Sequence, residues 1–368
     1  MNLTAAALLS RQSMRLCARS KWVTQSIECI KWLKREDIAL CSSVGMSTWE
    51  LLTSLGSIYR LRLNLYVPRS RGEDLRDQLE KIHVDFDLCP NLTTFVPVPS
   101  DGCADKGALW QLRDSWIVGR ADMLVPISIR PDGRLEHLLE QADRTDKIID
   151  RRFQVEYESE SANVSYTIAP EELNPHLSEI EGKFLIHWTR AFDGPWPTER
   201  PIDYYRSVIE SDVYPRSAFD TLRNIAATRT LKASSKHMPG KIAAVAFSKT
   251  APCKMLELIR WRSRYRHMSF EPYGIGIETQ TAENLGIMPV EYTDPDESRP
   301  TNGDSWLCQS KGEKADWTSE NEYRHRGDLD LSRIDRDKLI LICRTVDEAS
   351  AISAESGICA VSFTCAST

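Results

Sequence analysis

The sequence predicts an α/β domain with a mostly parallel sheet, followed by an α+β domain. In the first half of the chain, short apolar runs alternate with segments whose apolar residues recur at helical spacing. This alternation is typical of parallel sheets with helices on both faces. In the second half, short predicted strands outnumber helices. The length of 368 residues is enough for two domains.

The first domain is expected to contain five strands. The predicted strands cover residues 38–44, 63–67, 94–98, 123–129 and 153–157. Helices are expected from residue 48 onward and over residues 73–82, 109–118 and 135–142. The apolar start Thr4–Leu9 is too short to cross a membrane, and the basic residues follow it instead of preceding it as in a signal peptide. We therefore expect a helix there and a cytoplasmic protein without a membrane partner.

Ligands of such sheets bind beyond the carboxyl ends of the strands. Four residues around the end of the 38–44 strand then form a candidate nucleotide site: Ser42, Ser43, Gly45 and Thr48. The turn that contains Gly133 lies beside it. A glycine turn that leads into a helix offers backbone N–H groups to a phosphate. The alternative is an ordinary strand–helix turn, because the chain has no G-x-G-x-x-G motif and no Walker lysine.

Three stretches of the first half carry a family pattern. They are Cys41–Gly45 after a strand, Leu112–Ile117 in a helix, and Ala121-Asp122 before the strand that leads to Gly133. With them, residues 20–157 resemble the SLOG (DprA/LOG-like) superfamily. The resemblance implies a Rossmann-like N-terminal domain, residues 1–157, that binds or processes nucleotides. Arg113 and Asp114 would equally suit an exposed pair on a helix.

Residues 158–178 are predicted to link the two domains, because the composition turns polar and prolines follow. The α+β domain then covers residues 179–368. Its strands are expected at residues 184–189, 242–247, 273–277, 289–292 and 339–343. Its helices are expected at residues 204–209, 219–227, 253–261 and 346–355.

Polar residues in this second domain suit the cleavage of a glycosidic bond. Glu320 and Glu322 alternate, so in a strand both would project from one face. A carboxylate beside a ribose stabilises the positive charge that develops when its glycosidic bond breaks. His187 and Thr189 would share a strand face and hold a ribose or amide, and Tyr273 or Tyr292 would stack on a ring. The alternatives are a core histidine and edge glutamates that pair with Arg324 and Arg326.

Two further family patterns lie in the second half. His187-x-Thr189, then Thr221–Ile225 and Thr230–Ser234, resemble in this order the DarT-like and related ADP-ribosyltransferase folds. That resemblance implies that His187 and Thr189 hold NAD. The stretches at residues 246–248, 273–276, 289–292 and 317–324 are similar to uncharacterised bacterial families associated with abortive phage infection.

The best nucleic-acid signal is a run of four arginines interleaved with Trp261 and Tyr265: Arg260, Arg262, Arg264 and Arg266. Arginines with aromatic residues suit phosphate contacts and base stacking. The net charge of −6 gives no general attraction to nucleic acid, so binding would be local. The alternative is a solvated helix end whose arginines pair with Glu257 or Glu271.

Metal and thiol chemistry have little support in the sequence. None of the ten cysteines forms a Cys-x-x-Cys pair, so no metal site is predicted. Disulfides are not expected without a secretion signal, and no G-x-S-x-G motif indicates a serine hydrolase. Cys41, beside the predicted nucleotide loop, stays open as a nucleophile.

The sequence thus predicts an enzyme of bacterial phage defence or DNA modification that acts on NAD or another nucleotide. Two alternatives remain open. One is an enzyme that modifies a base already in DNA, and the other is a non-catalytic protein that binds nucleic acid or senses a nucleotide. The expected partners are a nucleotide and DNA, and an oligomer is left open.

Overall fold

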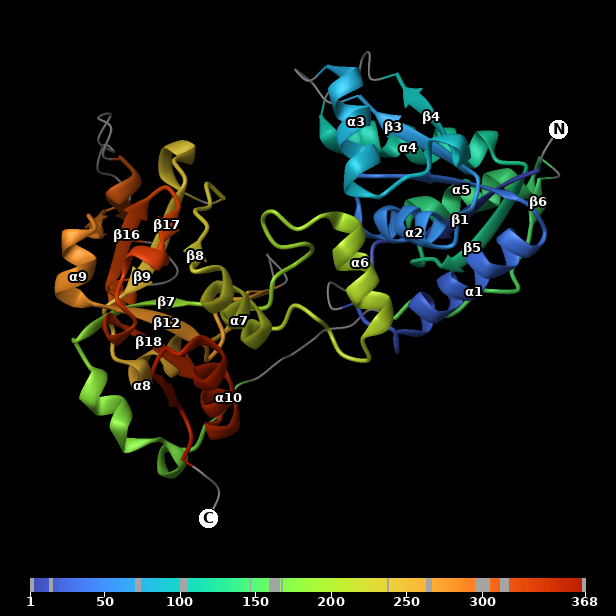
Figure 1. Cartoon of the computed structure of the whole chain (residues 1–368). Helices are drawn as coiled ribbons and strands as arrows, with labels where there is room; N and C mark the ends of the chain where they lie inside the picture. Colours follow the sequence, from blue (N-terminus) through green and yellow to red (C-terminus); the bar gives the residue numbers. More distant parts are fainter. Residues whose placement is uncertain are drawn as a thin grey trace. The chain divides into compact units, whose positions relative to one another are not determined.

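The computed structural model describes residues 3–12, 16–69, 74–99, 105–145, 147–158, 166, 168–236, 238–262, 267–294, 305–311 and 318–365. The chain forms two compact units (Figure 1). Unit 1 comprises Met1–Ser161 and Asp193–Pro215. Unit 2 comprises Ala162–Phe192 and Arg216–Thr368.

Unit 1 is built on a six-stranded parallel sheet in the order β4-β3-β2-β1-β5-β6. Its strands are β1 (Thr4–Leu9), β2 (Ala39–Ser43), β3 (Leu63–Pro68), β4 (Thr93–Val98), β5 (Met123–Ser128) and β6 (Ile148–Ile149). The helices α1 (Lys21–Arg35), α2 (Ser47–Ile58), α3 (Leu75–Asp85), α4 (Lys106–Arg120) and α5 (Arg134–Asp143) alternate with them. The predicted Rossmann-like α/β architecture is confirmed.

The prediction of a helix over Thr4–Leu9 is wrong, because this segment forms β1 near the middle of the sheet. Ala5–Leu9 are almost completely buried, since β1 pairs with β2 on one side and with β5 on the other. A strand that is buried on both faces reads as a continuous apolar run without alternation. The strand predicted over residues 153–157 is also reduced, since Val155 makes only an isolated bridge to Ser128.

The helix α6 (Pro201–Glu210) belongs to unit 1, although the sequence places it inside the second domain. Its buried side chains Tyr204, Tyr205 and Val208 join the apolar core that α2 also lines. The Tyr205 hydroxyl donates to Glu50 of α2 at 3.0 Å. The helix α6, which lies downstream of the first domain in the sequence, therefore forms part of the apolar core of unit 1.

Unit 2 contains a seven-stranded mixed sheet in the order β13-β16-β9-β7-β12-β18-β19. Its strands are β13 (Met288–Pro289), β16 (Glu322–Arg326), β9 (Ala244–Ser248), β7 (Phe184–Trp188), β12 (Gly274–Glu278), β18 (Leu339–Cys343) and β19 (Ala360–Ser362). Only β18 and β19 pair in parallel among the described strands of this sheet. The helices are α7 (Ala218–Thr228), α8 (Pro252–Met255), α9 (Thr279–Asn284) and α10 (Val346–Ser356). The predicted α+β class is confirmed.

Three short strand pairs complete unit 2: β10 (Trp261–Arg262) with β11 (His267–Met268), β14 (Glu291–Thr293) with β15 (Cys308–Ser310), and β8 (Thr230–Leu231) with β17 (Leu329–Asp330). The helix predicted over residues 253–261 is shorter, since α8 ends at Met255 and the chain is extended at Trp261. In the described part of the chain, no helix has both the length and the apolar character needed to span a membrane.

Candidate functional sites

The strand order of unit 1 reverses direction beside β1. The strands β2, β3 and β4 follow one another on one side of it, and β5 and β6 lie on the other side. Open parallel sheets bind ligands in the crevice beyond the carboxyl ends of the strands at such a reversal. The turns after β1, β2 and β5 leave the sheet at this edge, so we take it as the first candidate site.

The turn after β2 leads into α2 through Gly45, whose φ of 88° lies in the left-handed region. Its N–H donates to the Glu50 carboxylate at 3.0 Å, and burial raises the pKa of that carboxyl above its ordinary value. No described side chain caps the start of α2. No described side chain therefore satisfies the N–H groups of its first turn.

The turn after β5 repeats this arrangement. Gly133 is the N-cap of α5, again without a cap from a described side chain. The N–H of Asp132, just before it, donates to Glu136 at 2.7 Å. A Cβ atom at Gly133 would lie 2.8 Å from the carbonyl oxygen of Arg130, so the turn requires glycine.

Two buried residues that the sequence analysis missed hold the end of β1 to the turn after β5. The Ser10 hydroxyl accepts the N–H of Arg130 at 2.9 Å. The Gln12 amide donates to the carbonyl oxygens of Ser10 and Ser128 at 2.9 and 3.3 Å. The available signal was a pair of polar residues directly after a buried apolar run, which the helix prediction for Thr4–Leu9 concealed.

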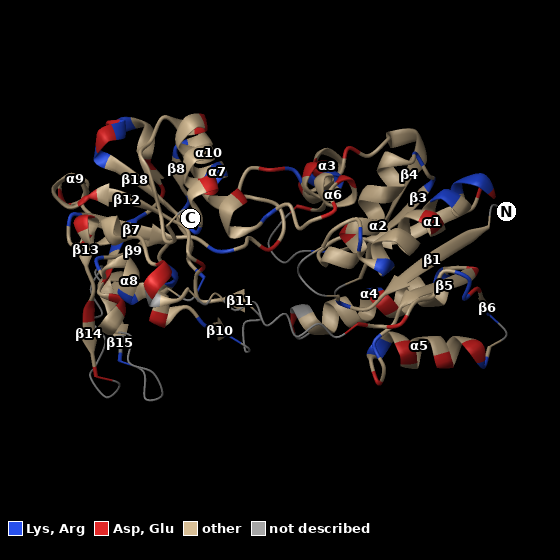
Figure 2. Cartoon of the chain, turned by 90° about the horizontal axis from the view of Figure 1, so that it is seen from below, with Lys and Arg blue, Asp and Glu red and all other residues tan. Residues whose placement is uncertain are grey.

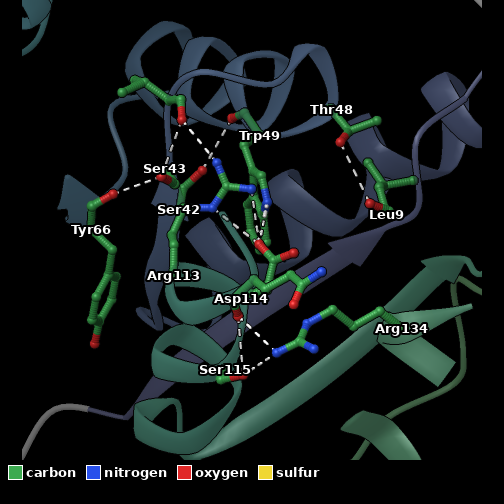
Figure 3. A network of polar contacts seen from close by, with 12 residues as sticks. Leu9, Ser42, Ser43, Thr48, Trp49, Tyr66, Arg113, Asp114, Ser115 and Arg134 are labelled. Atoms are coloured by element: carbon green, nitrogen blue, oxygen red, sulfur yellow. Dashed lines mark hydrogen bonds and ion pairs between the residues drawn. The ribbon is translucent and has the colours of Figure 1, made fainter. Parts of the chain in front are cut away.

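A buried polar network ties α4 to the Gly45 turn, and in Figure 3 Arg113, Asp114 and Trp49 point toward one another. The guanidinium of Arg113 is 0% exposed and donates to Asp114 at 2.9 and 3.0 Å. It also donates to the carbonyl oxygen of Val44 at 3.0 Å, and Trp49 Nε1 donates to Asp114 at 3.1 Å. Burial raises the pKa of Asp114, against the lowering effect of Arg113. The alternative of an exposed helix pair is therefore wrong.

The exposed ring of Trp110, on the first turns of α4, lies next to the Gly45 turn. Its side chain is one of the few large apolar groups at the surface, with 41% of the residue exposed. A Cβ atom at Gly45 would lie 3.8 Å from its Nε1. An aromatic face beside free backbone N–H groups suits a planar base next to a phosphate.

The hydroxyl groups predicted to bind a nucleotide instead make bonds inside the protein. Ser42 donates to the carbonyl oxygen of Trp49 at 3.2 Å, and Ser43 donates to that of Tyr66 at 2.6 Å. Thr48 donates to that of Leu9 at 3.5 Å. All three hydroxyl residues are buried, whereas Gly45 and Ser47 of this turn are exposed. Burial also raises the pKa of Cys41 to about 11, which leaves its thiol protonated at neutral pH.

In unit 2, the sheet separates His187 from Glu322. Ile186 and Glu322 both pair with Ser248 of β9, so these three side chains share one face. His187 is the next residue after Ile186 and therefore projects from the other face. Its Nδ1 lies 2.8 Å from the carbonyl oxygen of Ala246. Burial lowers the pKa of His187, so its ring is neutral at pH 7.

Thr189 and Tyr273 make side-chain hydrogen bonds within unit 2. The Thr189 hydroxyl lies 3.1 and 3.2 Å from the carbonyl oxygens of Ala218 and Tyr273. The Tyr273 hydroxyl donates to Glu348 at 2.9 Å. Thr189 and Tyr273 are both buried. The structure therefore places both hydroxyl groups in hydrogen bonds within unit 2.

The two predicted glutamates have different surroundings. Glu320 ends a short helical turn and Asn321 has a φ of 43°, so the expected strand alternation is interrupted before β16 begins at Glu322. The Glu322 carboxylate pairs with the buried Arg324 at 2.8 and 2.9 Å. Glu320 is partly exposed, and burial together with the charge of Glu322 raises the pKa of its carboxyl.

Glu320 lies next to the arginine run, with its carboxylate 3.8 Å from the Arg262 guanidinium. The Arg260 charge also acts on it. Arg264 and Arg266 lie outside the described residues. The structure thus brings one predicted catalytic carboxylate together with one predicted nucleic-acid contact. Among the residues that the structure describes, no group of three His, Cys, Asp or Glu side chains could hold a metal ion.

Known proteins give little indication of what this chain is similar to. No protein-family model matches it, and neither does any curated protein. A solved structure of DNA processing protein A from Helicobacter pylori, described with its single-stranded DNA-binding mode, is similar at a TM-score of 0.31 and 11% sequence identity. The similarity covers 42% of this chain and 68% of that one. At this TM-score the similarity supports no conclusion about function.

Proposed function

We propose that this chain binds a nucleotide at the edge of unit 1 where the strand order reverses. The observation that carries the proposal is the pair of uncapped helix starts, at α2 and α5, on either side of the end of β1. Helix starts attract phosphate through their free N–H groups and the helix dipole. The exposed ring of Trp110 supplies a stacking surface for the base. Membership of the SLOG superfamily is part of this proposal.

The direct test is a titration of the full chain with NAD, ATP and AMP by isothermal calorimetry. A bound nucleotide at about 100 times its Kd should also stabilise the fold by about 2.7 kcal/mol. If none of the three nucleotides binds or raises the Tm, the proposal is wrong.

Ser47→Glu should weaken nucleotide binding about tenfold or more without lowering stability. Ser47 is the exposed first residue of α2, where a carboxylate stabilises the helix dipole by about 0.3–1 kcal/mol. The same negative charge repels a phosphate at that helix start. Calorimetry measures the weaker nucleotide binding, and thermal unfolding measures the stability, which should not fall. Ser47→Gln adds length without charge, so it should bind the nucleotide like the natural chain. Equal affinity of the natural chain, Ser47→Glu and Ser47→Gln would show that the start of α2 is not part of the site.

A second candidate function, cleavage of a glycosidic bond of NAD or of a nucleobase in DNA, is favoured by Glu320. Its partly exposed carboxylate beside Arg262 could stabilise a positively charged ribose near a bound phosphate. Phage defence is part of this candidate on the sequence pattern of residues 246–248, 273–276, 289–292 and 317–324 alone. Its cellular test is plating efficiency of phage on cells that carry the gene.

Glu320→Gln should abolish such a reaction, with a loss of about 10² or more in rate. The measurement is nicotinamide release from NAD, with and without DNA, together with the mass of the DNA. The same substitution at Glu322, whose carboxylate is held by Arg324, serves as the comparison. If the natural chain releases no nicotinamide and leaves the mass of the DNA unchanged, this candidate is rejected.

A further inference from the structure

The Glu50 carboxylate occupies a backbone N–H group beside the proposed phosphate position at the start of α2. Its Oε1 accepts the N–H of Gly45 at 3.0 Å. Its Oε2 accepts a hydrogen bond from the hydroxyl of Tyr205, on α6, also at 3.0 Å. Glu50 lies in the first turn of α2 and is the only charged residue of this helix, which is otherwise neutral in the charge colouring of Figure 2. The protein therefore places an anion of its own at the edge where the nucleotide is proposed to bind.

A phosphate and the ionised Glu50 carboxylate compete for the Gly45 N–H. Two anions at hydrogen-bond distance repel each other strongly where water is partly excluded, so a bound phosphate favours the protonated form of the carboxyl. The protonated Glu50 can still accept the Tyr205 hydroxyl through its carbonyl oxygen. Its new O–H then donates to a phosphate oxygen, because a carboxylic acid is a hydrogen-bond donor as well as an acceptor. One proton from solution thus converts a repulsive contact into a hydrogen bond.

The surroundings of Glu50 favour this proton uptake. Glu50 is partly buried, and burial is the largest of the effects that raise the pKa of its carboxyl above the ordinary value. The charge of Asp85 acts in the same direction. The hydrogen bonds from Tyr205 and Gly45 and the charge of Arg113 lower this pKa. A phosphate that takes the Gly45 N–H removes one of these lowering influences, so the carboxyl accepts a proton more readily in the complex.

We propose that Glu50 guards the Gly45 turn, so that a nucleotide phosphate takes the Gly45 N–H only when the Glu50 carboxyl has accepted a proton from solution. This inference rests on the proposed nucleotide site and adds its regulation. Binding then takes up a proton, so the affinity for the nucleotide falls as the pH rises. The Tyr205 hydroxyl stabilises the ionised form of Glu50. The helix α6 therefore contributes to the guard, although Tyr205 lies 155 residues further along the chain than Glu50.

The test compares Glu50→Gln with the natural full chain by calorimetric titration with NAD, ATP and AMP at about pH 5 and about pH 8. Glutamine has the shape of the protonated carboxyl and no charge, so this variant should bind about tenfold or more tighter than the natural chain at the higher pH. At the lower pH this advantage should shrink about tenfold or more. The ratio of the two affinities at each pH cancels the titration of the nucleotide itself. Glu28→Gln, which removes an exposed carboxylate paired with Lys31 on α1, should leave both affinities unchanged.

Two further measurements keep the guard testable if Glu50→Gln does not fold. Tyr205→Phe removes only the hydroxyl from α6, so it should tighten binding at about pH 8 by about threefold or more. Titration of the natural chain in two buffers of different ionisation enthalpy should show uptake of about one proton at this pH.

The outcomes separate the guard from the nucleotide site. Binding by Glu50→Gln alone would support both proposals. Equal or weaker binding by a folded Glu50→Gln chain at the higher pH, or binding by the natural chain without proton uptake, would overturn the guard and leave the site. If neither chain binds any of the three nucleotides, the nucleotide site and the guard are both wrong.

Discussion

Arg113→Ala should lower the free energy of unfolding by about 3–5 kcal/mol, because it leaves a buried carboxylate without its cation. Arg113 is completely buried and donates to both Asp114 and the carbonyl oxygen of Val44. The substitution also releases the Gly45 turn from α4, so nucleotide binding should fall with stability. Urea unfolding of the full chain measures the loss.

The loss should be larger at pH 7 than near pH 4. Burial already raises the pKa of Asp114, and removal of Arg113 takes away the largest opposing influence. A carboxyl whose folded pKa lies above its unfolded value costs stability once it ionises, so the cost grows as the pH rises through the folded pKa. Arg120→Ala, on the same helix but exposed and stacked on Trp116 at 4.1 Å, is the matched control. Equal stability of the two variants would contradict the proposed role of Arg113.

Arg324→Ala should cost a similar amount, about 3–5 kcal/mol, in unit 2. Its guanidinium is 2% exposed and donates to both oxygens of Glu322, to the carbonyl oxygen of Trp306 at 2.6 Å and to Gln309 at 2.8 Å. Truncation leaves these acceptors partly buried and unpaired. Thermal or urea unfolding of the variant measures the cost.

Arg326→Ala provides the control for this substitution, because Arg326 lies on the same strand and the same face but is exposed. Its loss should be within about 0.5 kcal/mol, as for an ordinary surface position. The double variant Arg324→Ala/Glu322→Ala should recover part of the stability, since it removes the unpaired carboxylate as well. No recovery would show that the two side chains are not energetically coupled.

The fold was largely predictable from the sequence, because most strands and helices have a local signature. The four strands from β2 to β5 carry apolar runs between turn residues, and the helices after them carry apolar residues at helical spacing. Thr4–Leu9 was misassigned because burial on both faces removes the alternation that marks a strand. Its partners β2 and β5 lie far along the chain, so only the tertiary structure identifies it.

The site was much less predictable, because it depends on register and on single backbone angles. Whether His187 and Glu322 share a face is decided by their pairing through β9, which no local pattern encodes. The left-handed angle at Asn321 likewise breaks an alternation that the residue types alone favour. Gly45 and Gly133 were found because turns that lead into helices have a local signature, whereas the buried environment of Arg113 was not apparent from the sequence.

The segment Asp193–Pro215 belongs to unit 1 but lies between two segments of unit 2 in the sequence. A single cut of the backbone therefore cannot separate the two units. The backbone passes between them three times, and the N–H of Phe192 donates to the carbonyl oxygen of Arg216 at 2.9 Å where this segment starts and ends. A fragment that stops before residue 158 lacks α6 and uncovers the apolar surface against which Tyr205 and Val208 pack. Proteolytic cleavage between residues 158 and 178 would nick the chain without freeing either piece, because the downstream piece completes the core of the upstream one.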